Sequence, residues 1–492
     1  MLWFIVLYGI IAMGLSAYLY LRCHSKAEYI LGGRKMNSPT VGFTAQTAIS
    51  GYFFTVCIPL KVLDPSAGIW GAVFAAAGMV CGIFLSRFAV SRRLRIYSEI
   101  AGNSLSFPEY VENRFKDKTG ILRAVCAAVI LIFDIIFAAS IITVSADILD
   151  EFTSIGRVSA MIVCGLIIAI FVFLGGFPAI AATSHIKSLI MLLFFVFIII
   201  SGINADIFNP QGTTEDGFFV HAARTVNETG FTNGIVEHIL SFISYAILFF
   251  GLPMINTVYM SAKERRTPKR RIAYEFAWAI PSAVGAVLCG IIAKTVASGS
   301  VETPQDYVKA LSQGTVPIIG SMIMSLIFIV CLSTAESAVF SAGTALSYDL
   351  FAHSPKKQTT QKESLFLTRL STVVATVAAV LYAISGPISS FFSFDFIIML
   401  ISASFGPTVL FGLFSNRLTA RGSCISTGFG IISACVFNYF LPIYGLHVII
   451  GTIPSFLITT AVLFAVSLID KKSISKKMEN EFGRTKEIAV MK

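Results

Sequence analysis

The sequence has too few charged residues for a water-soluble protein of its length. Only 13% of the 492 residues are charged, whereas 55% are hydrophobic and the mean hydropathy is +0.80. One soluble core cannot bury that much apolar surface, so lipid must solvate a large part of it. No polar stretch is long enough to fold as a separate extramembrane domain. The composition therefore indicates a single membrane domain.

Patterns typical of catalytic and metal-binding sites are also missing. The sequence contains no CxxC pair, no His-Glu-x-x-His or Gly-x-Ser-x-Gly motif and no phosphate-binding glycine-rich loop. Most of the nine cysteines fall within apolar runs, where they are most simply packing residues. We therefore expect neither an enzyme nor a protein with a bound cofactor.

The net charge of +10 is compatible with nucleic-acid binding, but the placement of the basic residues argues against it. They cluster in short segments beside apolar runs, for example in residues 261–271. Such clusters are typical of anchoring to anionic lipid headgroups. Membrane lipid is thus an expected partner, nucleic acid is not, and no obligate protein partner is evident.

Apolar runs long enough to cross a bilayer, about 20 residues each, recur along the whole chain. They are too long and too uniformly apolar for β-barrel strands, so the predicted fold is all-α and polytopic. We predict thirteen transmembrane helices, at residues 2–20, 40–62, 67–90, 121–146, 157–175, 177–203, 235–260, 272–298, 315–347, 365–385, 388–415, 421–441 and 446–469.

The distribution of Lys and Arg predicts how these spans are oriented. Most of the 37 basic residues fall on one side of the membrane, in segments 21–39, 91–123, 261–271, 348–369 and 416–421 and in the tail from 470. The positive-inside rule then places the N-terminus outside and the C-terminus in the cytoplasm of a plasma (inner) membrane. The first run lacks the basic n-region and cleavage site of a signal peptide, so we expect it to be retained.

Two spans carry polar patches that suit a cation. The second span contains Gln46, Ile49 and Gly51 in an unusually polar and flexible stretch, where a break in the helix would free backbone carbonyls. In the ninth span, Val330, Ser333 and Thr334 share one helical face. The carbonyls of Gln46, Ile49 and Val330 and the hydroxyls of Ser333 and Thr334 would form a five-oxygen site. Helix packing through small residues and hydroxyl bonds within each helix are the ordinary alternatives.

Ionisable residues inside spans are costly and often functional. For Asp134, an interhelical hydrogen bond and a role with a cation or proton are equally compatible with the sequence; Glu336 belongs to the same group. We expect the long Lys187 side chain to reach the membrane surface. In the seventh span, Tyr245 and Phe249 precede a Gly-Leu-Pro interruption, which favours a solute cavity over plain core packing.

Six stretches, in order, together resemble the sodium:solute symporter family, particularly its sodium/proline branch. They are EYILGGR at 28–34, FPEYVENRF at 107–115, LGGF at 174–177, FGLP at 250–253, STAES at 333–337 and FGP at 405–407. Any one of these matches is weak, whereas six in order across nearly the whole chain are specific.

The resemblance implies a LeuT-like core of two inverted five-helix repeats. The repeats would occupy residues 40–203 and 235–415, joined by an extracellular loop at 204–234. An extra helix and loop (1–39) would precede them, and two helices (416–469) and a basic cytoplasmic tail (470–492) would follow. It also implies sodium-coupled symport of a small polar solute such as an amino acid or a carboxylate, with sodium as a co-transported ligand.

By resemblance, the sodium site falls on Gln46, Ile49, Val330, Ser333 and Thr334, and the solute pocket on Ser50, Gly51, Tyr52, Tyr245 and Phe249. Departures from the family pattern weaken sodium attraction. Ala48 and Ser184 replace two expected carboxylates along the cation route, and Lys187 replaces an expected Gln.

Other functions remain open at this point. The missing carboxylates and Asp134 are compatible with proton-coupled or uncoupled transport. A solute sensor on the same scaffold generally needs a signalling domain, for which the tail from 470 is too short.

Overall fold

Helices make up most of the described part of the chain, and no strand occurs there. The computed structural model describes residues 2–201, 234–265, 269–296, 301, 303–313, 317–351, 360–385, 393–470 and 476–490. The predicted extracellular loop at 204–234 lies outside these residues, apart from its last position. Parts of the predicted segment 348–369 and of the predicted tail lie outside them as well.

Ten helices of the described part are long and apolar enough to cross a membrane, or up to twelve if each of two bent pairs is one span. The all-α polytopic class is therefore confirmed. The predicted fifth and sixth spans are a single element, α9 (Arg157–Ser201), which kinks at Gly176 where the sequence placed their boundary. A count of thirteen and the sidedness of the termini stay predictions.

The first half of the chain contains long apolar helices linked by short amphipathic ones. Its elements before α9 are α1 (Leu2–Arg22), α2 (Lys26–Leu31), η1 (Gly32–Arg34), α3 (Ser38–Ala45), η2 (Gln46–Ser50), η3 (Phe53–Cys57), α4 (Ile58–Leu63), α5 (Gly68–Ser86), η4 (Arg87–Ser91), α6 (Arg92–Ile100), α7 (Phe107–Phe115) and α8 (Ile121–Thr153).

The second half repeats this alternation. Its elements are α11 (Ile235–Leu248), α12 (Pro253–Met260), α13 (Lys269–Val296), α14 (Pro304–Gln313), α15 (Pro317–Thr344), η6 (Ala345–Phe351), α16 (Gln361–Ser385), α17 (Phe394–Phe414), α18 (Ala420–Ile443), η8 (Val448–Gly451), α19 (Thr452–Ile469) and α20 (Lys476–Val490). Boundaries in this half agree with the predicted spans to within a few residues.

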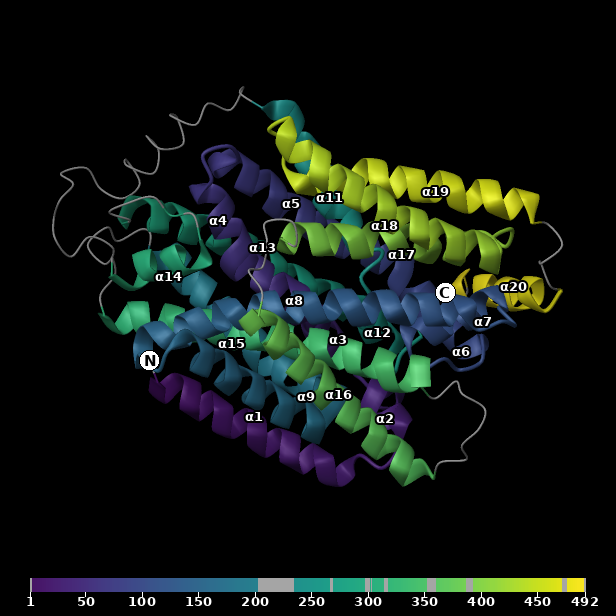
Figure 1. Cartoon of the computed structure of the whole chain (residues 1–492), viewed down its shortest axis with the longest axis horizontal. Helices are drawn as coiled ribbons and strands as arrows, with labels where there is room; N and C mark the ends of the chain where they lie inside the picture. Colours follow the sequence, from purple (N-terminus) through teal and green to yellow (C-terminus); the bar gives the residue numbers. More distant parts are fainter. Residues whose placement is uncertain are drawn as a thin grey trace.

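The most buried helix is α15, and the most peripheral is α1. The apolar window of α15 is 100% buried inside the protein, against 11% for that of α1. In Figure 1, α1 runs along one side of the bundle near α9, and α18 and α19 run along the opposite side. The face of α15 that carries Ser333 and Thr334 is thus enclosed by protein, whereas α1 offers most of its apolar surface to lipid.

Several basic segments meet at one end of the bundle, which we call the basic end. Helices α2, α6, α7 and α20 lie there, whereas α4 and α14 lie toward the opposite end, the far end (Figure 1). Arg34 donates hydrogen bonds to Ser98 Oγ (3.0 Å) and to the carbonyl oxygens of Met260 (3.1 Å) and Ser104 (2.6 Å). Burial lowers the pKa of the Arg34 guanidinium to about 10, so this side chain stays charged at neutral pH. The segments that the Lys and Arg distribution assigned to one side of the membrane therefore lie close together in the structure.

Two of the sequence motifs meet at the kink of α9. Gly176 has a φ of 53° and a ψ of −148°, a conformation that glycine adopts far more readily than other residues. A Cβ atom at Gly176 would lie 2.4 Å from Cε2 of Tyr29, whose hydroxyl donates to the Val172 carbonyl (2.8 Å). The Tyr29 ring of the EYILGGR stretch therefore packs against the kink in the LGGF stretch.

Candidate functional site

The predicted second span bends in its middle but does not unwind. Its two halves, Ser38–Ser50 and Phe53–Leu63, meet at 43°. Both η2 and η3 are π-helical, and the Gly51 N–H donates to the Gln46 carbonyl five residues earlier. Gly51 (φ −58°, ψ −58°) and Tyr52 (φ −60°, ψ −38°) keep helical dihedrals. The expected unwound backbone is therefore wrong: the chain stays helical through Gly51 and Tyr52, and two widened turns produce the bend instead.

The bent helix packs against the predicted partner face of α15. A Cβ atom at Gly51 would lie 2.9 Å from Cγ1 of Val330, so only glycine allows this close approach. Val330, Ser333 and Thr334 are all buried, as are Gln46 and Ile49. Thr334 Oγ1 donates to the Val330 carbonyl (3.1 Å) and keeps lone pairs that can coordinate a cation. The structure therefore brings together the two stretches predicted to hold the cation.

Several oxygens of the bent helix are buried without hydrogen bonds. Within the described residues, Thr44 Oγ1, Gln46 Oε1 and Ser50 Oγ have no partner. Buried polar atoms normally do have partners, and leaving one without costs free energy. These side-chain oxygens therefore add to the carbonyls as candidate ligands of a cation or a polar solute.

Lys187 lies beside Ser333, which the sequence did not predict. Its Nζ donates to Ser333 Oγ (2.7 Å) and to Glu336 Oε2 (2.8 Å), and its side chain is 1% exposed. The expectation that Lys187 reaches the membrane surface is therefore wrong. A buried carboxylate on α15 holds the ammonium inside the protein, where an unpaired charge would be far more costly than a paired one.

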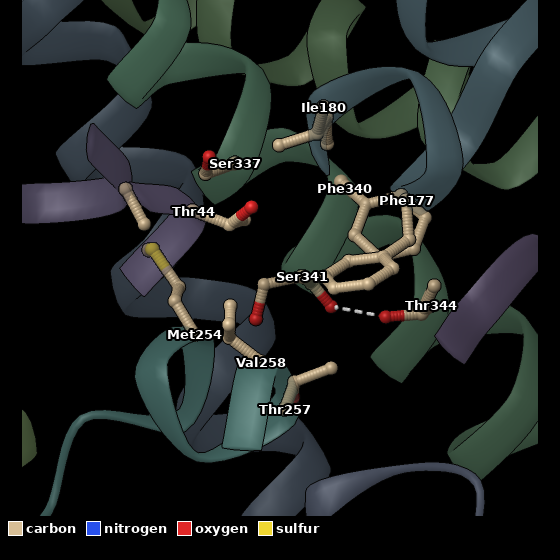
Figure 2. A pocket seen from close by; sticks show the side chains of 11 residues that line it. Thr44, Phe177, Ile180, Met254, Thr257, Val258, Ser337, Phe340, Ser341 and Thr344 are labelled. Atoms are coloured by element: carbon tan, nitrogen blue, oxygen red, sulfur yellow. Dashed lines mark hydrogen bonds between the residues drawn. The ribbon is translucent and has the colours of Figure 1, made fainter. Parts of the chain in front are cut away.

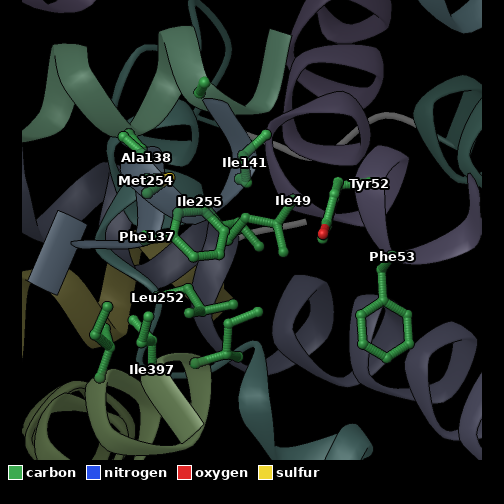
Figure 3. Packing of buried hydrophobic residues seen from close by; sticks show 14 of the residues in the cluster. Ile49, Tyr52, Phe53, Phe137, Ala138, Ile141, Leu252, Met254, Ile255 and Ile397 are labelled. Carbon is green, nitrogen blue, oxygen red and sulfur yellow. The ribbon is translucent and has the colours of Figure 1, made fainter. Parts of the chain in front are cut away.

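Apolar packing closes off most of the predicted solute residues. Ser50, Tyr52, Tyr245 and Phe249 are all buried. Figure 3 shows Tyr52 and Phe53 beside a cluster that contains Ile49, Phe137, Ile255 and Ile397. The Tyr52 ring lies 4.8 Å from the Phe394 ring, and the Phe53 ring lies 4.9 Å from the Tyr245 ring. Tyr52 and Tyr245 thus belong to one aromatic layer, linked through Phe53 and Phe394.

Phe249 lies at the second break, between α11 and α12, which bend by 42°. There the backbone does leave the helix, as the Gly-Leu-Pro interruption predicted, since Leu252 is extended (φ −74°, ψ 111°). Side chains satisfy the freed carbonyls: Ser402 Oγ donates to Leu248 (2.8 Å), Ser86 Oγ to Phe249 (3.1 Å) and Asn256 Nδ2 to Phe250 (3.3 Å). Each of these three carbonyls therefore accepts a hydrogen bond from a side chain at the second break.

An ion pair covers the aromatic layer toward the far end. Lys61 Nζ at the end of α4 contacts Asp395 Oδ2 at the start of α17 (3.0 Å). The Tyr245 hydroxyl lies 3.2 Å from both Asp395 carboxylate oxygens. This far-end pair ties together three helices that are distant in sequence.

A cavity lined by hydroxyl groups begins at Ala48 and Ser337 and extends from them toward the basic end. Figure 2 shows Thr44, Thr257, Ser337, Ser341 and Thr344 around it, with Phe177, Ile180 and Phe340 as apolar wall. The volume open to the centres of water-sized molecules is about 30 Å³, enough for roughly two waters. We call it the hydroxyl cavity.

Asp134 lies on α8 close to this cavity. Its side chain is fully buried, and neither carboxylate oxygen has a hydrogen bond within the described residues. The hydroxyl of Ser341, which lines the hydroxyl cavity, is its polar neighbour. A buried carboxyl group in this position is a candidate partner for a cation or a proton.

Sequence reasoning missed the hydroxyl cavity and the far-end pair. A signal for the cavity was present, because Ser333, Ser337 and Ser341 recur every four residues and so form one stripe on α15. The pairing of Lys61 with Asp395 had no such signal, because 334 positions separate the two residues.

Comparison with known proteins shows the family of this chain. The sodium:solute symporter family model matches residues 29–430. A sodium/proline symporter from Staphylococcus aureus is 26% identical over 465 residues, covering 91% of this chain and 88% of the relative. A second relative of that name, from strain JH9 of the same organism, matches to the same extent.

Solved structures share the fold. A Na⁺-coupled sialic acid symporter in a substrate-bound outward-open state superposes with a TM-score of 0.76 at 16% identity, covering 95% of this chain and 97% of that one. A nucleobase-cation-symport-1 family transporter in a closed conformation gives 0.56 at 12% identity, covering 94% and 98%. The family match over most of the sequence and the bent helix against α15 lead to one conclusion: this multi-pass membrane protein belongs to the sodium:solute symporter family and is a sodium-coupled symporter.

Proposed function

We propose that sodium binds between the bent helix and α15, held by the carbonyls of Gln46, Ile49 and Val330 and the hydroxyls of Ser333 and Thr334. The observation that carries this proposal is the approach of Gly51 to Val330, which leaves no room for a side chain between the two helices. Carbonyl and hydroxyl oxygens are the ligands that a hard cation prefers, and they need no change of protonation.

The co-transported solute would bind on the far-end side of this site, against Ser50, Gly51, Tyr52, Tyr245 and Phe249. The relatives named above transport or bind solutes that carry a carboxylate, namely proline and sialic acid. The Ser50 hydroxyl, which has no partner within the described residues, and the aromatic layer suit a small polar molecule with one apolar side. We infer an amino acid or a related carboxylate as the solute class.

Coupling in this scheme needs no covalent chemistry. Sodium would pull the bent helix onto α15, and that packing would preorganise Ser50 and Gly51 for the solute, so each ligand would favour the other. A reciprocal coupling of about 1 to 3 kcal/mol is typical of linked sites. An inward sodium ion gains about 2.3 kcal/mol per 100 mV of membrane potential, which would drive uptake.

In this conformation the far-end pair and the aromatic layer cover the site from one side, and the hydroxyl cavity reaches it from the other. We infer that sodium leaves through the hydroxyl cavity, past Ser337 and Ser341, toward the basic end. The positive-inside rule predicts that the basic end is cytoplasmic, and the described conformation would then be closed to the outside. Exposed apolar side chains on the peripheral helices, such as Trp3 and Leu7 on α1, would contact lipid.

Uptake in proteoliposomes tests the coupling ion. Purified protein is reconstituted, and sodium, potassium and proton gradients are imposed separately while radiolabelled proline, sialic acid and a panel of small carboxylates are offered. We expect at least one solute to accumulate only with an inward sodium gradient, and more strongly with an inside-negative potential. Protein-free liposomes and a sodium ionophore are the controls.

The same experiment also tests the alternative that the sequence left open, proton-coupled or uncoupled transport. Lys187 places a positive charge next to Ser333, where the family pattern expects a neutral Gln. Accumulation that follows a pH gradient and ignores sodium would establish this alternative and overturn the sodium site.

The far-end pair gives a separate prediction about access. We expect Asp395→Asn to weaken the closure, because Lys61 then loses its charged partner and Tyr245 loses a strong acceptor. The readout is the thiol of the neighbouring Cys57, in a background without the other eight cysteines. This thiol should then react about tenfold faster with a membrane-impermeant thiol reagent, because a tenfold change corresponds to a loss of about 1.4 kcal/mol in the free energy of closure.

A control and a converse outcome accompany this test. Arg421→Gln, which removes an exposed partner of Asp470 (3.5 Å), should leave the Cys57 reaction rate unchanged. Equal rates in Asp395→Asn and the parent would mean that the ion pair does not hold this side shut.

A further inference from the structure

Ser333 and Glu336 form a buried cation site, and the ammonium group of Lys187 already occupies it. The ammonium lies 2.7 Å from Ser333 Oγ and 2.8 Å from Glu336 Oε2. Two aromatic rings complete the enclosure, because Nζ lies 5.8 Å from the centroid of Tyr8 on α1 and 5.5 Å from that of Phe171 on α9. A hydroxyl, a carboxylate and two ring faces are all groups that stabilise positive charge.

The ammonium and the proposed sodium ion share one ligand. Ser333 Oγ accepts the hydrogen bond from Lys187, and the same oxygen is a proposed sodium ligand. Two positive charges a few ångströms apart repel each other strongly in a buried site. Glu336 supplies one negative charge, which compensates either Lys187 or sodium but not both. Sodium that binds while Lys187 stays in place would therefore carry an uncompensated charge.

We propose that Lys187 is a tethered competitor of sodium. Its ammonium occupies Ser333 and Glu336 when sodium is absent and has to leave Ser333 before sodium binds, after which Glu336 balances the sodium charge. This inference rests on the proposed sodium site. It assigns Lys187 a role in setting sodium affinity, and it assigns Glu336 the role of shared counter-ion.

The position of Lys187 links this exchange to the rest of the transport path. Lys187 lies on the half of α9 that follows the Gly176 kink, and the same half supplies Phe177 and Ile180 to the wall of the hydroxyl cavity. Movement of the ammonium away from Ser333 therefore acts on a helix that borders the proposed sodium exit. Competition between Lys187 and sodium for the Ser333 hydroxyl would therefore link sodium binding to the shape of the exit path.

Sodium titration of the purified full-length protein in nanodiscs tests the proposal without any solute. The readout is the sodium-dependent rise in unfolding temperature, with choline keeping the ionic strength constant. Lys187→Gln should lower the sodium concentration for half-maximal stabilisation by about tenfold relative to wild type, because removal of a nearby like charge favours sodium. Glu336→Gln added to Lys187→Gln should reverse this gain, because the counter-ion is then lost.

The matched control is Lys309→Gln, which removes a lysine that is 40% exposed and pairs with Glu151 at 3.5 Å. It should leave the sodium titration unchanged. If Lys187→Gln does not fold, Lys187→Met, which keeps most of the side-chain volume, takes its place, and size-exclusion chromatography verifies the folded state of each variant.

The outcomes separate the two proposals. If sodium stabilises wild type and Lys187→Gln with the same half-maximal concentration, Lys187 is not a competitor of sodium. The proposed sodium site is not contradicted by that result. Stabilisation that appears only after Lys187 is replaced supports the competitor but overturns sodium binding to the wild-type site. No sodium effect on wild type or on either Lys187 variant overturns both proposals.

Discussion

In the double variant Ser333→Ala/Thr334→Ala, we expect sodium to bind at least about 100-fold more weakly than to wild type. The two substitutions remove both hydroxyl ligands of the proposed site, and each interaction with a charged partner contributes roughly 1.5 to 3 kcal/mol. Scintillation proximity binding of radioactive sodium to purified protein measures this loss directly and needs no knowledge of the solute.

A hydroxyl elsewhere on the same helix provides the control. Ser325→Ala also removes a buried serine of α15, one whose Oγ donates to the Ser321 carbonyl (2.7 Å) away from the proposed site. We expect wild-type sodium binding in this variant. Wild-type binding in Ser333→Ala/Thr334→Ala as well would refute the assignment of the sodium ligands.

Gly176→Val should destabilise the protein strongly and lower the yield of folded protein. A positive φ combined with a ψ of −148° costs a residue with a side chain about 1 to 3 kcal/mol, and overpacking against the Tyr29 ring adds about 1 to 3 kcal/mol. The Tyr29 ring is fully buried, and its hydroxyl is bonded to Val172, so it has little freedom to move. Yield of monodisperse protein on size-exclusion chromatography and its unfolding temperature measure the effect.

The matched substitution Gly428→Val lies in α18, where a Cβ atom would meet nothing within 4 Å. We expect close to wild-type yield from it. A Gly176→Val variant that unfolds at the wild-type temperature would show that the kink and the Tyr29 contact do not matter for stability.

Hydrophobic runs predicted the helices well because a membrane imposes one simple length requirement. The same criterion missed α2, α6, α7, α14 and α20, since short amphipathic helices do not contain twenty apolar residues. Their existence depends on partners elsewhere in the fold. The contact of Lys116 with Glu481 (2.7 Å), for example, joins the end of α7 to α20 across most of the chain.

Local sequence located the two bends but not their geometry. Small and polar residues around Gly51 and the Gly-Leu-Pro at 251–253 both predicted interruptions, and both helix pairs bend. The first bend uses widened turns and the second an extended residue, which local composition does not distinguish. Proline at 253 removes one backbone N–H and restricts Leu252 to extended dihedrals, and the first bend lacks such a constraint.

The sequence alone could not predict whether the Lys187 side chain reaches the membrane surface or the interior of the protein. A lysine near a helix end reaches water when nothing inside the protein compensates its charge. Lys187 instead meets Glu336, which lies 149 positions away in the sequence. Each residue was notable by itself as an ionisable group within a span, but only the packing of α9 on α15 joins them.

The first helix has a consequence for how this protein is handled and how it evolves. Although α1 precedes the family match, which begins at residue 29, its Ser16 Oγ donates to the Phe171 carbonyl (2.7 Å), and its Tyr8 ring covers the Lys187 ammonium. Deletion of α1 would remove the Tyr8 ring from one side of the Lys187 and Glu336 pair and the Ser16 hydrogen bond from α9. An N-terminal fusion is therefore best attached in front of an intact α1. Substitutions in this peripheral helix should be tolerated least on the face that carries Tyr8 and Ser16.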